Sequence, residues 1–162
     1  MKKNIAILAG EPNSINSEII AKSWKKIKKN KRKKIFLIGS FKLYRDQFKI
    51  LKIKLPLKKI KSIHEVNSRN SLNIIDINLK YQRCFNVNKK NSSKYIKRCL
   101  NIAHNLAIKK KILGFINCAI DKKSLGKNNF GVTEYLSKKN NLKNAEAMMI
   151  YNNKFAVVPI TT

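Results

Sequence analysis

The chain has 162 residues, 43% of them apolar, with only 5 Gly and 3 Pro, so it is long enough for a folded domain and is neither disordered nor collagen-like. Lys and Arg number 37 against 8 Asp and Glu, which gives a net charge of +29. The sequence contains no apolar run near the roughly 18 residues that a membrane-spanning helix needs, and the run at residues 5–10 is too short for a signal peptide. We therefore expect no membrane association.

The first half of the chain alternates between buried strands and amphipathic helices. Residues 4–10 form a continuous apolar run that ends at a glycine, which is typical of a buried strand. Helical spacing predicts a helix over residues 15–29, capped by Asn13 and Ser14 or by Asn16 and Ser17. A second buried strand follows at 34–40 and a helix at 41–51, and a further strand is predicted at 71–78. Residues 52–55 and 60–63, on either side of Pro56, are short extended candidates.

The second half predicts a long helix, another buried strand and a hairpin. Residues 80–90 lack periodicity and are assigned to a loop. Ser92 or Ser93 would cap a helix that runs to about residue 111. One face of this helix carries Tyr95, Cys99, Ile102, Ala103 and Leu106. Residues 112–119 are continuously apolar, like a central parallel strand. A short helix or turn at 121–125, a helix at 133–139, and strands at 146–151 and 154–160 around an Asn-Asn turn complete the prediction.

This alternation predicts an α/β fold: a three-layer α/β/α arrangement with a mostly parallel sheet, in which residues 5–8, 35–38 and 113–116 are central strands. Ligands bind such sheets at the carboxyl ends of the strands. We therefore expect the loops at residues 10–14, 117–123 and 131–134 to converge on one site. The chain stops on an apolar strand at residues 157–162, which suggests the first domain of a longer, truncated protein. A complete small domain is the alternative.

The positive charge has two interpretations. The chain has 32 Lys but only 5 Arg, and Lys, Asn and Ile, which have A/T-rich codons, make up nearly half of it. Dedicated nucleic-acid surfaces favour Arg, with aromatic residues for stacking. The densest basic run, residues 25–34, falls at the expected end of a helix, where lysines complement the helix dipole. We favour a solvated surface with no specific nucleic-acid partner. The alternative is a basic α/β module that binds RNA or another polyanion.

The cysteines and histidines form no recognisable site. Cys84, Cys99 and Cys118 are far apart, and neither His64 nor His104 lies near them at ligand spacing. An odd, sparse set of cysteines fits reduced thiols in a cytoplasmic protein. We expect Cys99 to be a small core residue, and we expect no metal site within this chain.

Four segments, in order, resemble the 4-hydroxythreonine-4-phosphate dehydrogenase family. Gly10-Glu11-Pro12, with Ile15 and Glu18-Ile19 after it, is similar to the family's G-[ED]-P-x-x-I-x-x-E-I opening. Residues 116–122 (INCAIDK) look like its I-T-x-P-I-x-K segment, and residues 131–136 (GVTEYL) look like its G-H-T-E-[FY]-[FL] segment. Residues 159–162 (PITT) look like the stretch before a T-T-H whose His is a metal ligand. The resemblance covers the whole chain but about half of a family member.

The resemblance implies a fold like that of isocitrate and isopropylmalate dehydrogenases, with two α/β/α domains per subunit, in a cytoplasmic homodimer. The implied reaction is NAD- or NADP-dependent oxidation of 4-hydroxythreonine 4-phosphate followed by loss of CO2, which gives 3-amino-2-oxopropyl phosphate in pyridoxine (vitamin B6) biosynthesis. A divalent metal ion (Zn, Mg or Co) held by histidines would act as a Lewis acid. The expected metal-binding His would lie just after Thr162.

The resemblance also implies roles for particular residues. Thr133 would contact the substrate phosphate, and Lys122 would be its electrostatic partner, while Asn117 and Asp121 would shape the same cleft. The alternatives are that Thr133 only begins a helix and that Lys122 is one more solvated lysine. Val132 stands where the family has His, so it cannot donate a hydrogen bond to phosphate. Two further differences are Ala119 in place of a family Pro, and Ser14 and Asn16 in place of glycines. By itself the chain is expected to be inactive.

Overall fold

The main sheet has five parallel strands in the order β3-β4-β2-β1-β5. The computed structural model describes residues 4–126, 131–142 and 146–159. The strands are β1 (Asn4–Leu8), β2 (Ile35–Gly39), β3 (Leu57–Ile60), β4 (Leu72–Asp76) and β5 (Ile112–Asn117). In register, Ala6 of β1 lies between Phe36 of β2 and Phe115 of β5.

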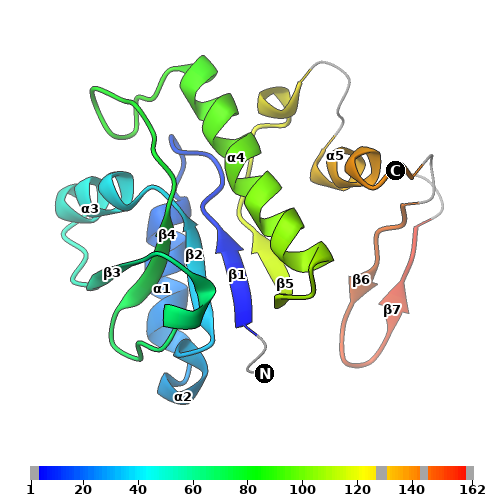
Figure 1. Ribbon diagram of the computed structural model, residues 1–162, viewed down its shortest axis with the longest axis horizontal. Helices are drawn as coiled ribbons and strands as arrows, with labels where there is room; N and C mark the ends of the chain where they lie inside the picture. Colours follow the sequence, from blue (N-terminus) through cyan, green and yellow to red (C-terminus); the bar gives the residue numbers. More distant parts are fainter. Residues whose placement is uncertain (1–3, 127–130, 143–145, 160–162) are drawn as a thin grey trace.

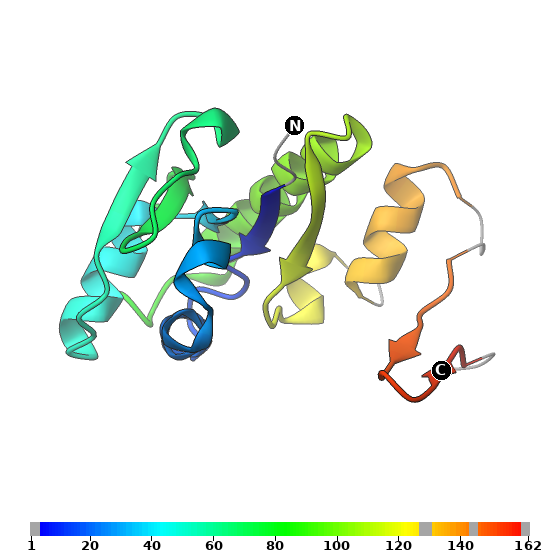
Figure 2. The ribbon, with the colours of Figure 1, turned by 90° about the horizontal axis from the view of Figure 1, so that it is seen from below.

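Helices cover both faces of this sheet (Figures 1 and 2). One face carries α1 (Asn16–Lys26) and α3 (Phe41–Ile50), and α4 (Lys89–Ile108) crosses the other. The shorter helices are α2 (Lys29–Arg32), η1 (Ile63–Glu65), η2 (Lys122–Leu125) and α5 (Val132–Lys139). The expected three-layer α/β/α fold with a mostly parallel sheet is confirmed.

The core forms where the continuously apolar strands meet these helices. Phe36, Leu37 and Ile38 of β2 are all fully buried, because a central strand has a helical layer on each face. The predicted inner face of α4 is confirmed at Tyr95 and Cys99, both of which are buried. Burial raises the pKa of the Cys99 thiol to about 12, as expected for a core thiol.

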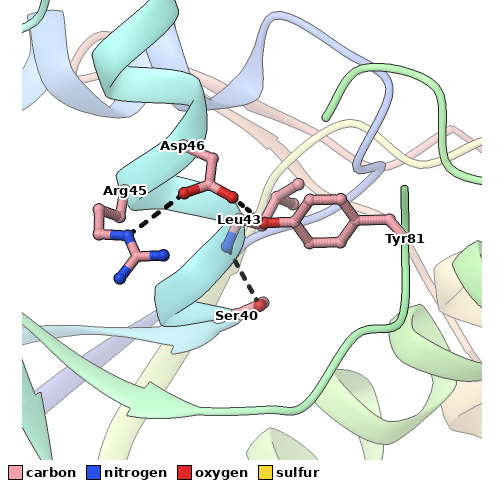
Figure 3. A network of polar contacts seen from close by, with 5 residues as sticks. All are labelled: Ser40, Leu43, Arg45, Asp46 and Tyr81. Carbon is pink, nitrogen blue, oxygen red and sulfur yellow. Dashed lines mark hydrogen bonds and ion pairs between the residues drawn. The ribbon is translucent and has the colours of Figure 1, made fainter. Parts of the chain in front are cut away.

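A polar network ties the loop after β4 to α3 (Figure 3). The Tyr81 hydroxyl donates to the Asp46 carboxylate at 2.6 Å, and the Arg45 side chain contacts the other oxygen of Asp46 at 3.2 Å. The Lys42 ammonium lies 4.9 Å from the centroid of the Tyr81 ring. At the start of α3 the Ser40 hydroxyl caps the helix by accepting from the backbone N–H of Leu43. The helix predicted at 41–51 is thus confirmed, and its first turn is well anchored.

The predicted end of the first helix is wrong. The first helix ends at Lys26 rather than residue 29, because Ile27 and Lys28 are extended and α2 follows as a separate turn. Arg32 holds this bend by donating to the carbonyls of Ile27 and Lys25.

The caps also differ from the prediction. Ile15 is the N-cap of α1 and makes no side-chain cap, although the Ser14 hydroxyl accepts from the N–H of Asn16. Asn88, rather than Ser92 or Ser93, caps α4, because its side chain accepts from the N–H of Asn91. The long helix therefore begins at residue 89, inside the predicted loop 80–90.

The strand predictions need two corrections. The strand near Pro56 is Leu57–Ile60, so residues 52–55 are not a strand, and of the candidate at 60–63 only residue 60 belongs to one. More important, β5 is not central: it lies at the edge of the sheet among the described residues, with β1 as its one neighbour. Apolar continuity correctly predicted a strand here, but strand order depends on long-range pairing that periodicity does not report.

The last described segment is a separate antiparallel hairpin, β6 (Ile150–Tyr151) and β7 (Ala156–Val157). Its turn runs from Asn152 to Phe155, whose backbone groups exchange hydrogen bonds at 2.8 and 3.2 Å. The predicted hairpin is confirmed, although the strands are shorter than 146–151 and 154–160, and residue 160 lies outside the described part. Both views place the hairpin on the β5 side of the sheet, beyond α5 (Figures 1 and 2).

Candidate functional site

The loops after β1 and β5 meet directly at the carboxyl edge of the sheet. The backbone N–H of Glu11 donates to the carbonyl of Ala119 at 2.9 Å. The Asn16 side chain lies between the two loops and donates to the carbonyls of both Ala9 and Ala119, at 3.2 and 2.9 Å. Because Asn16 is buried, these two bonds hold the loops together in a water-poor setting.

Gly10 permits this close approach. Its φ is +70°, in the left-handed region that favours glycine. A Cβ built on Gly10 would lie 2.5 Å from the Ala119 carbonyl oxygen and 2.5 Å from the Asn16 amide nitrogen. The contact between the two loops therefore requires glycine at position 10, independently of any ligand.

The rest of the first loop is anchored from two sides. The Gln47 side chain on α3 donates to the carbonyl of Pro12 at 2.8 Å. Asn13 pairs with the backbone of Val87, accepting from its N–H at 2.7 Å and donating to its carbonyl at 2.8 Å. The Glu11 side chain differs from its neighbours, since its buried Oε2 has no hydrogen-bond partner among the described residues.

The short helix η2 continues directly from the β5 loop. Asp121 is its N-cap, and its carboxylate accepts from the N–H of Lys123 at 3.0 Å. The exposed Lys122 is the first residue of η2. On the inner side, the Ser93 hydroxyl of α4 donates to the Ser124 carbonyl at 2.6 Å. Asp121 is thus a helix cap in this structure, while the Lys122 side chain is accessible to solvent.

The first turn of α5 carries Val132 and Thr133. Gly131 is its N-cap, so Thr133 lies within the first turn of the helix rather than at its cap. Val132 is half-buried and packs against the core, whereas Thr133 is exposed. The Glu134 carboxylate folds back over Gly131, since its Oε2 lies 3.0 Å from the position that a Cβ built on Gly131 would take.

α5 is held beside α4 and contacts η2. The Tyr135 hydroxyl donates to the Asn101 side chain at 2.9 Å, and the His104 Nε2 contacts the Asn140 side chain at 3.0 Å. Contacts between α5 and η2 place the 131–134 turn next to the 121–125 turn. The structure therefore joins the loops at 10–14 and 117–122 by direct hydrogen bonds. It brings the start of α5 to the same region indirectly, through the contacts of α5 with η2.

The expected divalent metal does not fit the described residues. No group of three or more His, Cys, Asp or Glu side chains comes together in the part of the chain that the structure describes. The half-buried His104 contacts Asn140 where α4 meets α5, and His64 lies on η1 near the amino edge of the sheet, where the carbonyl of Ile63 accepts from Asn4. Cys118, beside the loop contact, is a poor thiolate ligand, because burial raises its pKa to about 11. The PITT segment, residues 159–162, lies largely outside the described residues.

The basic run at residues 25–34 shows no built polyanion site. Its one arginine, Arg32, is engaged with backbone carbonyls and lies 5.6 Å from the centroid of the Trp24 ring. Trp24 itself is buried and unavailable for stacking on a base. Nor, within the described residues, is any helix long and apolar enough to cross a bilayer.

The sequence did not indicate three residues that build the site: Asn16, Asn13 and Gln47. In the sequence, Asn13 and Asn16 are only candidate helix caps, and Asn16 also replaces a family glycine. Its bond to Ala119 spans 103 residues of sequence, and that of Gln47 to Pro12 spans 35. No local pattern contains such contacts, although a polar residue on the inner face of a helix, as at Gln47, is a usable indication.

Comparison with known proteins agrees with the fold of this chain. The model of the pyridoxal phosphate biosynthetic protein PdxA family matches residues 31–162. The solved 4-hydroxythreonine-4-phosphate dehydrogenase from Klebsiella pneumoniae is 25% identical, with a TM-score of 0.80 over 96% of this chain and 50% of its own. The enzyme of that name from Burkholderia phymatum is 18% identical and has the same fold, with a TM-score of 0.83 over 98% of this chain and 49% of its own. A search of curated proteins gave no match.

The chain thus spans about half the length of these solved relatives, and its described part lacks a metal site. Because the family model covers most of the chain and the expected fold is present, the chain belongs to the PdxA family of pyridoxal phosphate biosynthetic proteins.

Proposed function

We propose that this chain supplies the phosphate-binding side of a 4-hydroxythreonine-4-phosphate dehydrogenase cleft. The reaction of the complete site would be NAD- or NADP-dependent oxidation followed by decarboxylation, in the cytoplasm. The observation that supports this most is the Glu11–Ala119 contact, which joins the β1 and β5 loops at the carboxyl edge of a parallel sheet. That edge is where α/β folds bind their ligands.

Thr133 and Lys122 are the residues of this chain suited to a phosphate. Thr133 is exposed in the first turn of α5, where backbone N–H groups and the helix dipole favour an anion. Lys122, on the adjacent η2, would add a positive charge. Glu134 lies over the same helix end, so a phosphate would have to displace its carboxylate or bind beside it. Asn117, at the end of β5, would contribute only to the wall of the cleft.

The chemical step requires more than the described residues. A divalent metal would polarise the substrate hydroxyl, but the described residues provide no ligand set for it. We propose that the metal ligands, most NAD(P) contacts and a second α/β domain come from polypeptide outside the described part, within a homodimer. This chain's own contribution is then to bind and orient the phosphorylated end of the substrate.

Binding of 4-phosphohydroxythreonine, measured by isothermal titration calorimetry at low salt, tests the proposal. Thr133→Ala and Lys122→Ala should each weaken binding roughly three- to tenfold, because each removes one contact to the phosphate. Lys111→Ala is the matched control, since it makes the same charge change just before β5, at the opposite end of the strand. Equal weakening in all three variants would show non-specific attraction to the basic surface and would overturn the assignment.

A further inference from the structure

Glu11 carries the one acidic oxygen among the described residues that is buried without a hydrogen-bond partner. Six of the eight acidic side chains are paired within the chain, namely those of Glu18, Asp46, Glu65, Asp76, Asp121 and Glu146. A buried carboxylate oxygen without a donor is costly, because nothing replaces the water that it has lost. At the carboxyl edge of a parallel sheet, such an acceptor indicates a donor that comes from a ligand.

The backbone around Glu11 is fixed on both sides. The Glu11 N–H donates to the Ala119 carbonyl at 2.9 Å, and the Glu11 carbonyl accepts from the Ser14 hydroxyl at 2.6 Å. Glu11 as a whole is half-buried, so part of its side chain reaches the surface. Rotation about the last bond of a glutamate side chain meets only a small barrier, so either oxygen can be turned toward a ligand. The carboxylate can therefore meet a ligand without a movement of the loop.

Charge narrows the kind of donor that fits this position. A metal ion would need further ligands, and the described part of the chain brings no three ligating side chains together. A phosphate or a carboxylate would be repelled by Glu11, and Lys122, three residues after Ala119, suits such a group better. Hydrogen bonds to a carboxylate are strongest when the donor also carries a charge. An ammonium group is the best match.

The substrate named for the solved relatives, 4-hydroxythreonine 4-phosphate, is an amino acid with one ammonium group, at the end of the molecule away from the phosphate. We propose that Glu11 binds this ammonium group and makes the site selective for a phosphorylated amino acid over a phosphorylated hydroxy acid. The inference rests on the proposed function, which assigns only the phosphate end of the substrate, to Thr133 and Lys122.

The test compares ligands by isothermal titration calorimetry at neutral pH. The first is 4-phosphohydroxythreonine, and the second is 3-hydroxy-4-phosphobutanoate, in which hydrogen replaces the ammonium group. The chain should bind the first roughly tenfold more tightly. General attraction to a chain of net charge +29 predicts the opposite order, because the second ligand carries more net negative charge. A preference for the ammonium ligand therefore requires a specific acceptor.

Glu11→Gln keeps the size of the side chain and removes its charge, so the preference should fall to roughly twofold or less. Glu18→Gln is the matched control, because it makes the same charge change on α1, where Glu18 pairs with Lys22 at the surface. This control should keep the preference. Phosphohomoserine, which retains the ammonium group and lacks the 3-hydroxyl, should lose affinity in Glu11→Gln as 4-phosphohydroxythreonine does.

Urea unfolding separates ligand recognition from a structural role of Glu11. Glu11→Gln should lower the unfolding midpoint no more than Glu18→Gln does, since each variant loses one negative charge and the buried Glu11 oxygen gives up no hydrogen bond. A clearly larger loss in Glu11→Gln would show that the carboxylate is bonded within the chain, and would overturn the proposal.

The proposal is also overturned if the original chain binds both ligands equally well, or if Glu11→Gln keeps the preference. Failure of the phosphate site would give a different result. Thr133→Ala and Lys122→Ala would then leave both affinities unchanged, while the preference for the ammonium ligand would still depend on Glu11. Binding of neither ligand would overturn both assignments.

Discussion

The backbone N–H of Glu11 donates to the carbonyl of Ala119, 2.9 Å away, and so joins two loops that are more than a hundred residues apart in sequence. The contact is possible because Gly10 adopts a positive φ and has no Cβ that would clash with the Ala119 carbonyl and the Asn16 amide. Everything proposed for this edge of the sheet depends on that junction, so it is the first feature to test.

Gly10→Ala should destabilise the chain by about 2 kcal/mol or more, because alanine at φ +70° is strained and its Cβ would clash with the Ala119 carbonyl. Gly114→Ala is the matched control, since its Cβ would enter open space without a positive φ. Its effect should lie within about 0.5 kcal/mol of zero. Urea unfolding of the two variants makes the comparison, and equal losses would contradict the proposed junction.

Asn16→Ala should cost about 1–3 kcal/mol in free energy of unfolding, because it removes the buried amide that donates to the carbonyls of Ala9 and Ala119 and leaves Ala119 with the Glu11 N–H alone. Asn105→Ala, at an exposed position on α4, is the control and should be neutral or slightly stabilising, since alanine favours helix. A neutral Asn16→Ala would mean that water replaces the amide, and that the junction depends on the backbone alone.

The local chemistry of this junction was predictable from sequence, but its assembly was not. Gly10, Glu11 and Pro12 follow a buried strand, and that position alone places them at the carboxyl edge of a parallel sheet. Asn16 and Gln47 complete the site through contacts across 103 and 35 residues, which no periodic pattern encodes. The cap of α4 was misplaced for a simpler reason. Asn88 and Ser92 are both good caps, and only the bond to Asn91 decides between them.

The position of β5 shows the same limit at the level of the fold. Residues 112–119 are as apolar as β2, and their pattern predicts a strand covered on both sides. The structure places this strand at an edge with Leu113 and Ile116 exposed. Strand existence follows from local apolar runs, whereas strand order follows from pairing between distant segments.

The stability of the chain should fall in acid partly through Asp46. The hydrogen bond from Tyr81 holds the pKa of Asp46 below its ordinary value of 3.8. A carboxyl whose pKa is lowered on folding stabilises the protein above its unfolded pKa, and this stabilisation is lost as the pH falls through the folded value.

Tyr81→Phe should therefore lessen the loss of stability below about pH 4. Urea unfolding between pH 6 and pH 2 measures this slope. Asp46→Asn should lessen it as well, and an unchanged slope in both variants would show that the contact does not persist in solution.

The chain alone should show no dehydrogenase activity. Oxidation of the substrate hydroxyl in this family is expected to need a bound metal, and the described residues bring no three ligating side chains together. His104 contacts Asn140 rather than another ligating side chain, and burial raises the pKa of the Cys118 thiol to about 11. The measurement is absorbance of the reduced cofactor when the purified chain receives NAD or NADP, a divalent metal and 4-phosphohydroxythreonine. Turnover above a blank without enzyme, and its loss in His64→Gln or His104→Gln, would show that a metal site assembles from residues the described structure leaves apart. Activity that appears only after addition of the part of the solved relatives that this chain does not cover would support the role proposed for this chain.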